Sequence, residues 1–190
     1  MSKPVPQRAD AARNRERLIE AARDSFAAGN DSESLENIAR AAGVGIGTLY
    51  RNFPTREALV EAVYRSELDA VTAMADTLIA RHEGFEALRL WMARYTRFVA
   101  TKRGMLDALR SAWASGSIPA SETRARITEA ICKILHKGTS DGSIRSDIAA
   151  EDVTVSMLAM VLATRTSEDK GQLQRLLDLL LEGLRARGSD

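Results

Sequence analysis

The sequence has little of what marks several classes of protein. It contains one cysteine, Cys132, among 190 residues, so no disulfide can form within the chain and the composition fits a reducing cytoplasm. No apolar run is long enough to span a bilayer. The polar N-terminus, with Pro4 and Pro6, lacks the apolar segment of a secretory signal. We therefore expect a cytoplasmic protein with no membrane partner.

Catalytic and metal motifs are missing as well. We find no Ser-His-Asp set, no phosphate-cradling glycine loop and no paired-carboxylate site. His82 and His136 have no second ligand at metal spacing. Cys132 falls in an amphipathic segment, which predicts a buried, inert thiol. The sequence thus predicts neither an enzyme nor a metal or cofactor.

The charge of the chain is nearly balanced, with a formal net charge of +1, but it is unevenly distributed. The first 17 residues hold five basic side chains against Asp10 and Glu16; the basic ones are Lys3, Arg8, Arg13, Arg15 and Arg17. We expect residues 1–10 to form a flexible basic arm that can reach a phosphate or a minor groove. A solvated tail is an equal alternative for Lys3 and Arg8.

The apolar residues recur with helical spacing, and no strand-like alternation, repeat or low-complexity tract is present. These patterns predict an all-α fold of about nine helices. No glycine, proline or serine-rich break occurs between residues 57 and 80, so we expect one continuous helix to join residues 11–66 to a second helical domain, 67–190. The predicted helices span 11–28, 35–42, 45–52, 55–80, 85–101, 105–114, 121–137, 151–164 and 172–187.

Two short helical patterns flank one glycine between residues 35 and 53. Leu35, Ile38, Ala39 and Ala42 share one face, and Gly43 follows where a helix needs a left-handed residue to end. The second helix turns Leu49 and Phe53 inward, one turn apart, and Ser34 can cap the first helix. This arrangement predicts a helix-turn-helix.

Several short segments lie in and around this helix-turn-helix: Ile38-Ala39, Ala42-Gly43-Val44, Gly47-Thr48-Leu49-Tyr50, Phe53-Pro54 and Glu57-Ala58-Leu59. Together they resemble the N-terminal domain of the tetracycline-repressor (TetR) family of transcriptional regulators, and the resemblance covers residues 14–64. It implies double-stranded DNA as a partner. It also implies that the hydroxyls of Thr48 and Tyr50 bind backbone phosphates.

Other residues of this segment take roles by position or by resemblance. Gly45, Ile46 and Gly47 lie where base edges are met, and Ile46 can contact a thymine methyl group. The family more often has a serine or threonine and then a polar residue at Gly45 and Ile46, so the operator cannot be inferred from relatives. Ser34 and Arg56 are candidates for phosphate contacts, and Asn52 is a candidate for a phosphate or a base contact. Arg51 can either contact a base or remain in solvent, and the sequence favours neither.

The C-terminal helices carry more apolar residues than one protomer is expected to bury. The resemblance implies that the segments 151–164 and 172–187 form a four-helix bundle with a second copy; an internal leucine-rich hairpin is the alternative. The expected interface residues are Val153, Met157, Val161, Leu173, Leu177, Leu180 and Leu184.

Aromatic and methionine side chains recur through the same half of the chain. They suit a pocket for an apolar or aromatic effector and are equally ordinary core residues. The candidates are Trp91, Tyr95, Phe98, Met105, Trp113, Met157 and Met160, with Tyr95, Arg94 or Arg110 as polar anchors. We predict a repressor that binds a palindromic operator as a homodimer and is released by a small molecule. An effector-independent DNA-binding protein or an activator remains the alternative.

Overall fold

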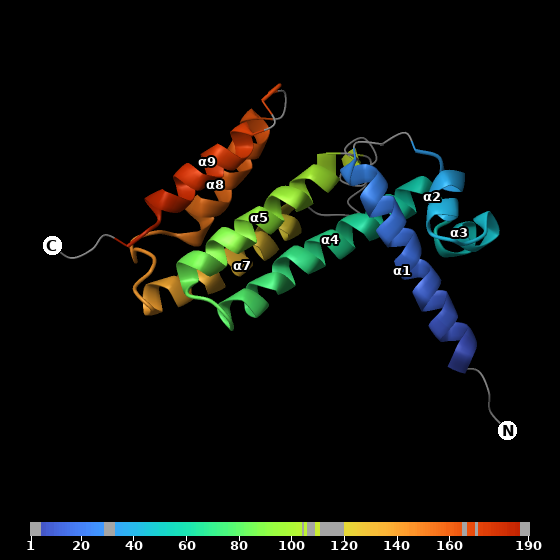
Figure 1. Ribbon diagram of the computed structural model, residues 1–190, viewed down its shortest axis with the longest axis horizontal. Coiled ribbons are helices and arrows are strands. Elements are labelled where there is room, and N and C mark those ends of the chain that lie inside the picture. The colour runs from blue at the N-terminus through green and yellow to red at the C-terminus, as the bar shows by residue number, and fades with distance from the viewer. Residues whose placement is uncertain are drawn as a thin grey trace. The chain divides into compact units, whose positions relative to one another are not determined.

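Most of the described residues of the chain are helical. The computed structural model describes residues 5–28, 33–103, 105, 109–110, 120–164, 167–169 and 171–186. They contain eight α-helices and one isolated β-bridge, which confirms the all-α prediction (Figure 1). The helices are α1 (Val5–Ala27), α2 (Leu35–Ala41), α3 (Ile46–Asn52), α4 (Arg56–Ile79), α5 (Gly84–Arg103), α7 (Ala120–Ser140), α8 (Ala150–Ala163) and α9 (Gln172–Gly183).

The chain divides into two compact units. The first comprises Met1–Glu67 and Ala100–Pro119, and the second comprises Leu68–Val99 and Ala120–Asp190. The division in α4 falls one residue after the domain boundary expected from the sequence, but Ala100–Pro119 joins the first unit instead of the second. The predicted helix at 105–114 lies largely outside the described residues. α4 is continuous from Arg56 to Ile79, as expected.

The core of the first unit follows the predicted stripes. Leu18, Ala22 and Phe26 of α1 are fully buried. Leu49 on α3 is also fully buried, and Phe53 is almost fully buried. The helix α1, however, begins at Val5, so residues 5–10 are helical and not a flexible arm. A proline at position 6 is compatible with the first turn of a helix, because it lacks only an N–H that would have no helical partner.

In the second unit, two glycines mark a close approach between helices. A Cβ at Gly84, where α5 begins, would overlap the backbone of Gly138 in α7, and a Cβ at Gly138 would overlap Ile144. We predicted that Gly138 would end its helix, but α7 continues to Ser140. This glycine is needed for space and not for a turn.

The N-terminus of α5 is capped by residues far along the chain. The Gly84 N–H donates to Oδ2 of Asp141 at 2.8 Å, and the Phe85 N–H donates to Oγ of Ser143 at 3.0 Å. Partial burial opposes the charge of Asp141, but hydrogen bonds from Ser143 and Gly84 and the contact with Lys137 outweigh it. Together they lower the pKa of Asp141 from 3.8 to about 2.

The last helix is shorter than its leucine stripe predicted. α9 ends at Gly183, after which Arg185 forms a β-bridge with Ile144. The N–H of Arg145 donates to the carbonyl of Leu184 at 3.0 Å, and the N–H of Ala186 donates to that of Ser143 at 3.1 Å. These backbone bonds replace the helical ones, which sequence periodicity cannot indicate.

The exposure of Cys132 and the lengths of the helices each bear on an expectation from the sequence. Cys132 is exposed on α7, not buried, because it lies off the inward stripe of Ile127, Ile131 and Ile134. None of the described helices combines the length and apolarity required to traverse a bilayer.

Candidate nucleic-acid interface

The turn between α2 and α3 is built by its own sequence. Gly43 has φ +66°, in the left-handed region where a side chain would be strained. The N–H of Gly43 donates to the carbonyl of Arg40 at 3.1 Å, and that of Val44 donates to Ala39 at 3.0 Å. This pair of bonds is a Schellman motif, which satisfies the last carbonyls of α2. It directs the chain straight into α3.

Caps at the starts of α2 and α4 are equally local. Oγ of Ser34 accepts the N–H of Asn37 at 3.1 Å, and Oγ1 of Thr55 accepts the N–H of Ala58 at 3.2 Å. The cap at Ser34 was predicted. Ser34 is exposed, so the α2 N-terminus remains open to an anion from solvent.

The outer face of α3 exposes the residues that the sequence placed there. Ile46 is 38% exposed and Tyr50 is 46% exposed, although both are large and partly apolar. Gly45 and Gly47 are also exposed, and no atom lies within 4 Å of where their Cβ would be. The start of α3 is therefore a surface that another molecule can approach closely.

The polar residues of α3 bond along their own helix. Nε of Arg51 donates to the carbonyl of Gly47 at 3.0 Å, and its guanidinium reaches Oγ1 of Thr48 at 3.3 Å. Nδ2 of Asn52 donates to the carbonyl of Thr48 at 2.8 Å. Thr48 and Asn52 are half-buried and Arg51 is exposed. These contacts hold the side chains along the face that Ile46 and Tyr50 share.

Arg56 has an internal role. Its guanidinium donates to the carbonyl of Glu33 and lies 5.6 Å from the ring centroid of Phe26. It is half-buried and ties the start of α4 to the segment before α2. A phosphate contact by Arg56 would have to share the guanidinium with these partners.

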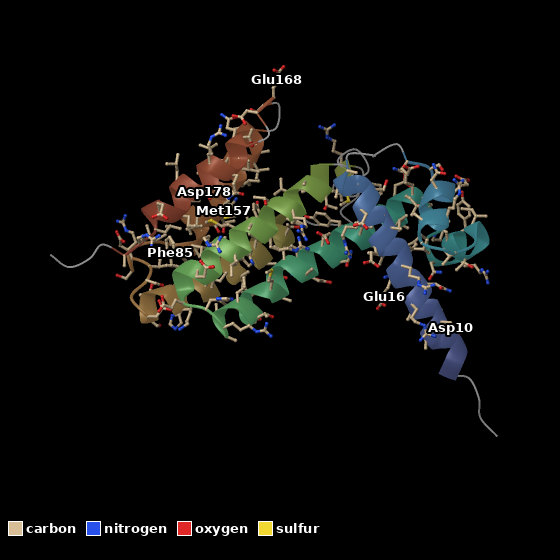
Figure 2. The ribbon with its side chains drawn as sticks, in the orientation of Figure 1. Asp10, Glu16, Phe85, Met157, Glu168 and Asp178 are labelled. Atoms are coloured by element: carbon tan, nitrogen blue, oxygen red, sulfur yellow. The ribbon has the colours of Figure 1, made fainter. Side chains whose placement is uncertain are left out.

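The basic side chains of α1 are also partly engaged. Arg13 pairs with Asp10 along the helix, and the Arg15 guanidinium lies 5.1 Å from the ring centroid of Phe53. Asp10 and Glu16 extend from the same helix in Figure 2. The side chains of Lys3 and Arg8 lie outside the described ones.

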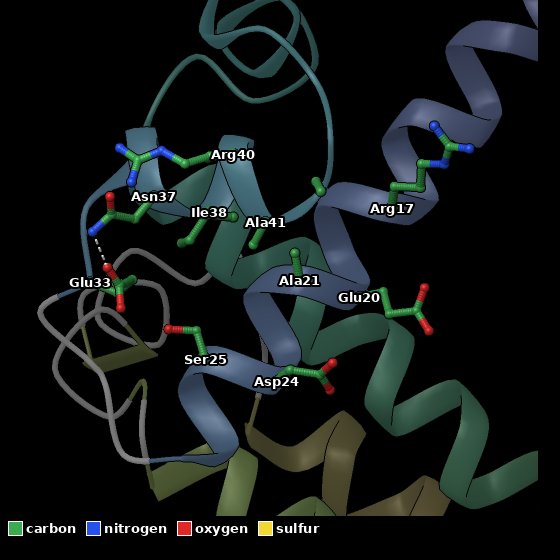
Figure 3. Close-up of a pocket in the computed structure, with 11 residues that line it drawn as sticks. Arg17, Glu20, Ala21, Asp24, Ser25, Glu33, Asn37, Ile38, Arg40 and Ala41 are labelled. Atoms are coloured by element: carbon green, nitrogen blue, oxygen red, sulfur yellow. Dashed lines mark hydrogen bonds between the residues drawn. The ribbon is translucent and has the colours of Figure 1, made fainter.

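A polar groove of about 730 Å³ between α1 and α2 was not predicted. Figure 3 shows Arg17, Glu20 and Asp24 along α1, with Asn37 and Arg40 on α2 across the groove. Its carboxylates outnumber its guanidiniums, since Glu33 also lines it, so it does not favour an anion. Helical periodicity predicts only the inward stripes of α1 and α2, and the groove lies between their outward faces.

The C-terminal helices bury part of the predicted dimer face within the protomer. Four of the seven expected interface residues are buried within the protomer: Val153, Met157, Leu177 and Leu184. Val161, Leu173 and Leu180 are half-buried. The exposed apolar residues of α8 lie on its other side, at i, i+3, i+4 and i+7: Val155, Leu158, Ala159 and Leu162. On α9, Leu179 is 70% exposed. Because α8 is apolar nearly all round, its sequence did not indicate which side faces inward.

The expected pocket residues are core residues. Trp91, Tyr95, Phe98, Met105 and Met157 are buried, and Met160 is half-buried; Figure 2 marks Met157 in the second unit. Trp91 stacks on Tyr95 at 5.7 Å between ring centroids, and its indole N–H donates to the carbonyl of Val71 in α4 at 2.8 Å. None of these side chains lines a cavity described in the structure. Trp113 lies outside the described residues. Of the polar anchors, Arg94 is half-buried and Arg110 is exposed.

The described residues indicate no metal site. In the part of the chain that the structure describes, no three His, Cys, Asp or Glu side chains lie close enough together to hold a metal ion.

Two protein-family sequence models match the chain. One, described as "Bacterial regulatory proteins, tetR family", matches residues 18–63, which include the whole turn and α3. The other, described as "Transcriptional regulator SbtR-like, C-terminal domain", matches residues 83–186. The two matches together extend over both units.

Solved structures and curated sequences agree with these matches. The chain is 42% identical to a TetR transcriptional regulator, SCO0520 from Streptomyces coelicolor, covering 92% of this chain and 99% of that one, with a TM-score of 0.80. It is 33% identical to a TetR regulatory protein from Mycobacterium vanbaalenii, covering 95% and 100%, with a TM-score of 0.75. It is 29% identical over 110 residues to an HTH-type transcriptional regulator from Staphylococcus aureus, SAUSA300_2515, covering 55% of this chain. The chain spans 57% of the length of that curated relative.

Proposed function

Since the chain belongs to the TetR family of transcriptional regulators, we propose that it binds a palindromic operator as a homodimer and releases it when a small molecule binds. Members of this family are DNA-binding regulators and not enzymes. The observation that carries the proposal is the outer face of α3, where Ile46 and Tyr50 remain exposed beside Thr48. A water-facing helix gains nothing from these side chains, whereas a helix in a major groove uses both.

Each residue of this face has a definite role in the proposal. The hydroxyls of Tyr50 and Thr48 bind phosphates on either side of the groove and set the register of α3. Ile46 contacts a thymine methyl group, and Gly47 lets the α3 backbone approach the base edges. The exposed N-terminus of α2, with Ser34, binds a further phosphate. Arg51 is free to leave its own helix, since its bonds there are exposed to solvent.

A second copy of the chain completes the operator contact. One short recognition helix covers too few base pairs for a unique site, so two copies read the two halves of a palindrome about one DNA turn apart. The exposed α8 stripe of Val155, Leu158, Ala159 and Leu162, with Leu179 of α9, is the self-association surface. Its aliphatic character fits the more apolar interfaces of homodimers.

The effector acts by favouring one of two states. An apolar or aromatic molecule that enters among the aromatic residues of α5 displaces them, and the bond from Trp91 to Val71 connects that movement to α4. Only three residues separate the end of α3 from the start of α4. The effector changes operator affinity only if it binds the two states with different affinity.

The experiment is operator selection from random DNA, followed by binding assays of two variants. Tyr50→Phe weakens binding to all sequences by about tenfold to a hundredfold, the value of one hydrogen bond to a charged group. Ile46→Ala instead changes the preference at one base pair, by about 1 kcal/mol or more. Thr96→Ala, which removes a hydroxyl from the exposed side of α5, is the control. Equal affinity of the unaltered chain for the selected and random DNA would refute the proposal.

A further inference from the structure

Two charged residues occupy inward positions on the helices that frame the helix-turn-helix. Arg23 follows the buried Ile19 by four residues on α1, and Glu67 follows the buried Val63 by four residues on α4. Residues four apart share a helix face, so an apolar side chain is expected at both positions. Glu67 is 1% exposed, although it is charged.

These two residues pair with each other. Nε of Arg23 lies 2.8 Å from Oε1 of Glu67, and their side chains are 33% and 2% exposed. A carboxylate this deeply buried is unfavourable unless it is paired, and two apolar side chains of similar volume are often at least as stabilising. The pair therefore does not serve stability best. It differs from an apolar contact because a shift of α1 would leave the buried carboxylate of Glu67 unpaired, so it permits fewer placements of α1 on α4.

A third helix meets α4 at the same point. Tyr64, one turn before Glu67, is fully buried, and Nζ of Lys102 from the end of α5 lies 6.0 Å from its ring centroid. Burial lowers the pKa of Lys102, as expected for an ammonium group removed from water. Both α1 and the end of α5 thus contact α4 within residues 64–67.

The placement of α1 on α4 bears on α3. The α1 residue Arg15 lies over Phe53, directly after α3, and Phe26 lies under Arg56 at the start of α4. α3 is held between these contacts and the short connection to α4. A change in how α1 crosses α4 must therefore tilt α3.

We propose that Arg23 and Glu67 are positioning residues for DNA binding, whose ion pair holds α1 on α4 in the arrangement in which α3 fits the operator. This inference rests on the proposed function, because it requires an operator. Neither residue touches the DNA; both act through α3.

The test replaces the pair by two apolar residues in the full-length chain, Arg23→Met/Glu67→Met. The variant retains its helical content and unfolds at the same or a higher temperature. Its affinity for the selected operator falls about tenfold or more, the equivalent of one displaced base contact. The matched control is Glu61→Met/Arg65→Met, which removes a 2.7 Å ion pair from a more exposed face of α4. It leaves operator affinity within about twofold of the unaltered chain.

Each other outcome has a definite meaning. If the folded double variant binds the operator as the unaltered chain does, the pair is only packing and the inference is wrong. If the double variant does not fold, the pair is required for the fold and the inference is again wrong. If the unaltered chain itself selects no operator, the failure lies with the proposed function.

Discussion

Two helical faces of the molecule expose large apolar side chains, and they differ in what surrounds those side chains. On α3, Ile46 and Tyr50 stand beside the polar Thr48 and Arg51. On α8, Val155 and Leu162 belong to a stripe that is aliphatic from end to end. A mixed face suits a polar partner with grooves and methyl groups, whereas an aliphatic face suits another apolar surface. Similar exposure thus supports two different partners, DNA and a second copy.

The two units also differ in how their helix ends are secured. In the first unit, Ser34 and Thr55 cap helices that begin at the next residue. In the second unit, α5 is capped by Asp141 and Ser143, which lie 57 and 58 residues further along the chain. The first kind of cap forms wherever the local sequence occurs, but the second exists only when the whole unit is folded.

The largest expected effect tests the α8 face. Leu158→Glu/Leu162→Glu places two carboxylates in the middle of the apolar stripe, where burying them against a second copy is unfavourable. We expect self-association to weaken by about a hundredfold or more, since each leucine contributes about 1.5–3 kcal/mol when buried. Sedimentation equilibrium at micromolar concentration measures the dissociation constant of the dimer.

The control for that variant is Cys132→Glu, which adds a carboxylate to an exposed position of α7. It should associate as the unaltered chain does. A double variant that is still dimeric would place the interface elsewhere and remove the contrast between the two faces.

A smaller effect tests the α3 face. Gly47→Ala has space in the free protein and favours the helix, so the free energy of unfolding rises by about 0.5–1 kcal/mol. Operator affinity nevertheless falls about tenfold, because the added methyl group prevents close approach to the base edges. Thermal unfolding and a binding titration on the same sample separate the two changes. Unchanged affinity would show that Gly47 does not face the DNA.

The smallest effect concerns the long-range cap of α5. Asp141→Asn lowers the free energy of unfolding by about 0.3–1 kcal/mol near neutral pH, because it keeps an acceptor oxygen but removes the negative charge at the N-terminus of α5. The pKa of Asp141 is lowered to about 2 in the folded chain. Its charge therefore contributes stability above about pH 4, and the contribution is lost as the pH falls through about 2.

The measurement is urea unfolding of both proteins across that pH range. The difference between them should shrink toward pH 2. Asp147→Asn, which alters an exposed carboxylate paired with Arg145, serves for comparison and should change stability by less than about 0.5 kcal/mol. A difference that stays constant with pH would mean that the charge of Asp141 is not what caps α5.

Features that depend on residues close together in the sequence were predicted correctly, and features that depend on distant residues were not. The turn at Gly43, the cap at Ser34, and the inward Leu49 and Phe53 were all predicted and are all present. Each depends on residues within a few positions. The ends of α7 and α9 were predicted wrongly, and the inward side of α8 was not indicated by its sequence. Each of these features is decided by a neighbour distant in sequence.

The Arg23–Glu67 ion pair could be predicted only in part from the sequence. A charge four residues after Val63, in a stripe otherwise apolar, is visible in the sequence, and so is Arg23 after Ile19. Helical spacing marks both as exceptions, but it cannot show that they meet. Only the packing of α1 on α4 brings their atoms to 2.8 Å.

The amino-acid sequence alone determined the helix-turn-helix, since glycine conformation, helix capping and apolar periodicity act over a few residues and need no distant partner. Tertiary structure decided which side of α8 is exposed and that Trp91 and its aromatic neighbours form core. An apolar side chain gains as much free energy against one apolar surface as against another, so its burial depends on which surface the fold brings to it.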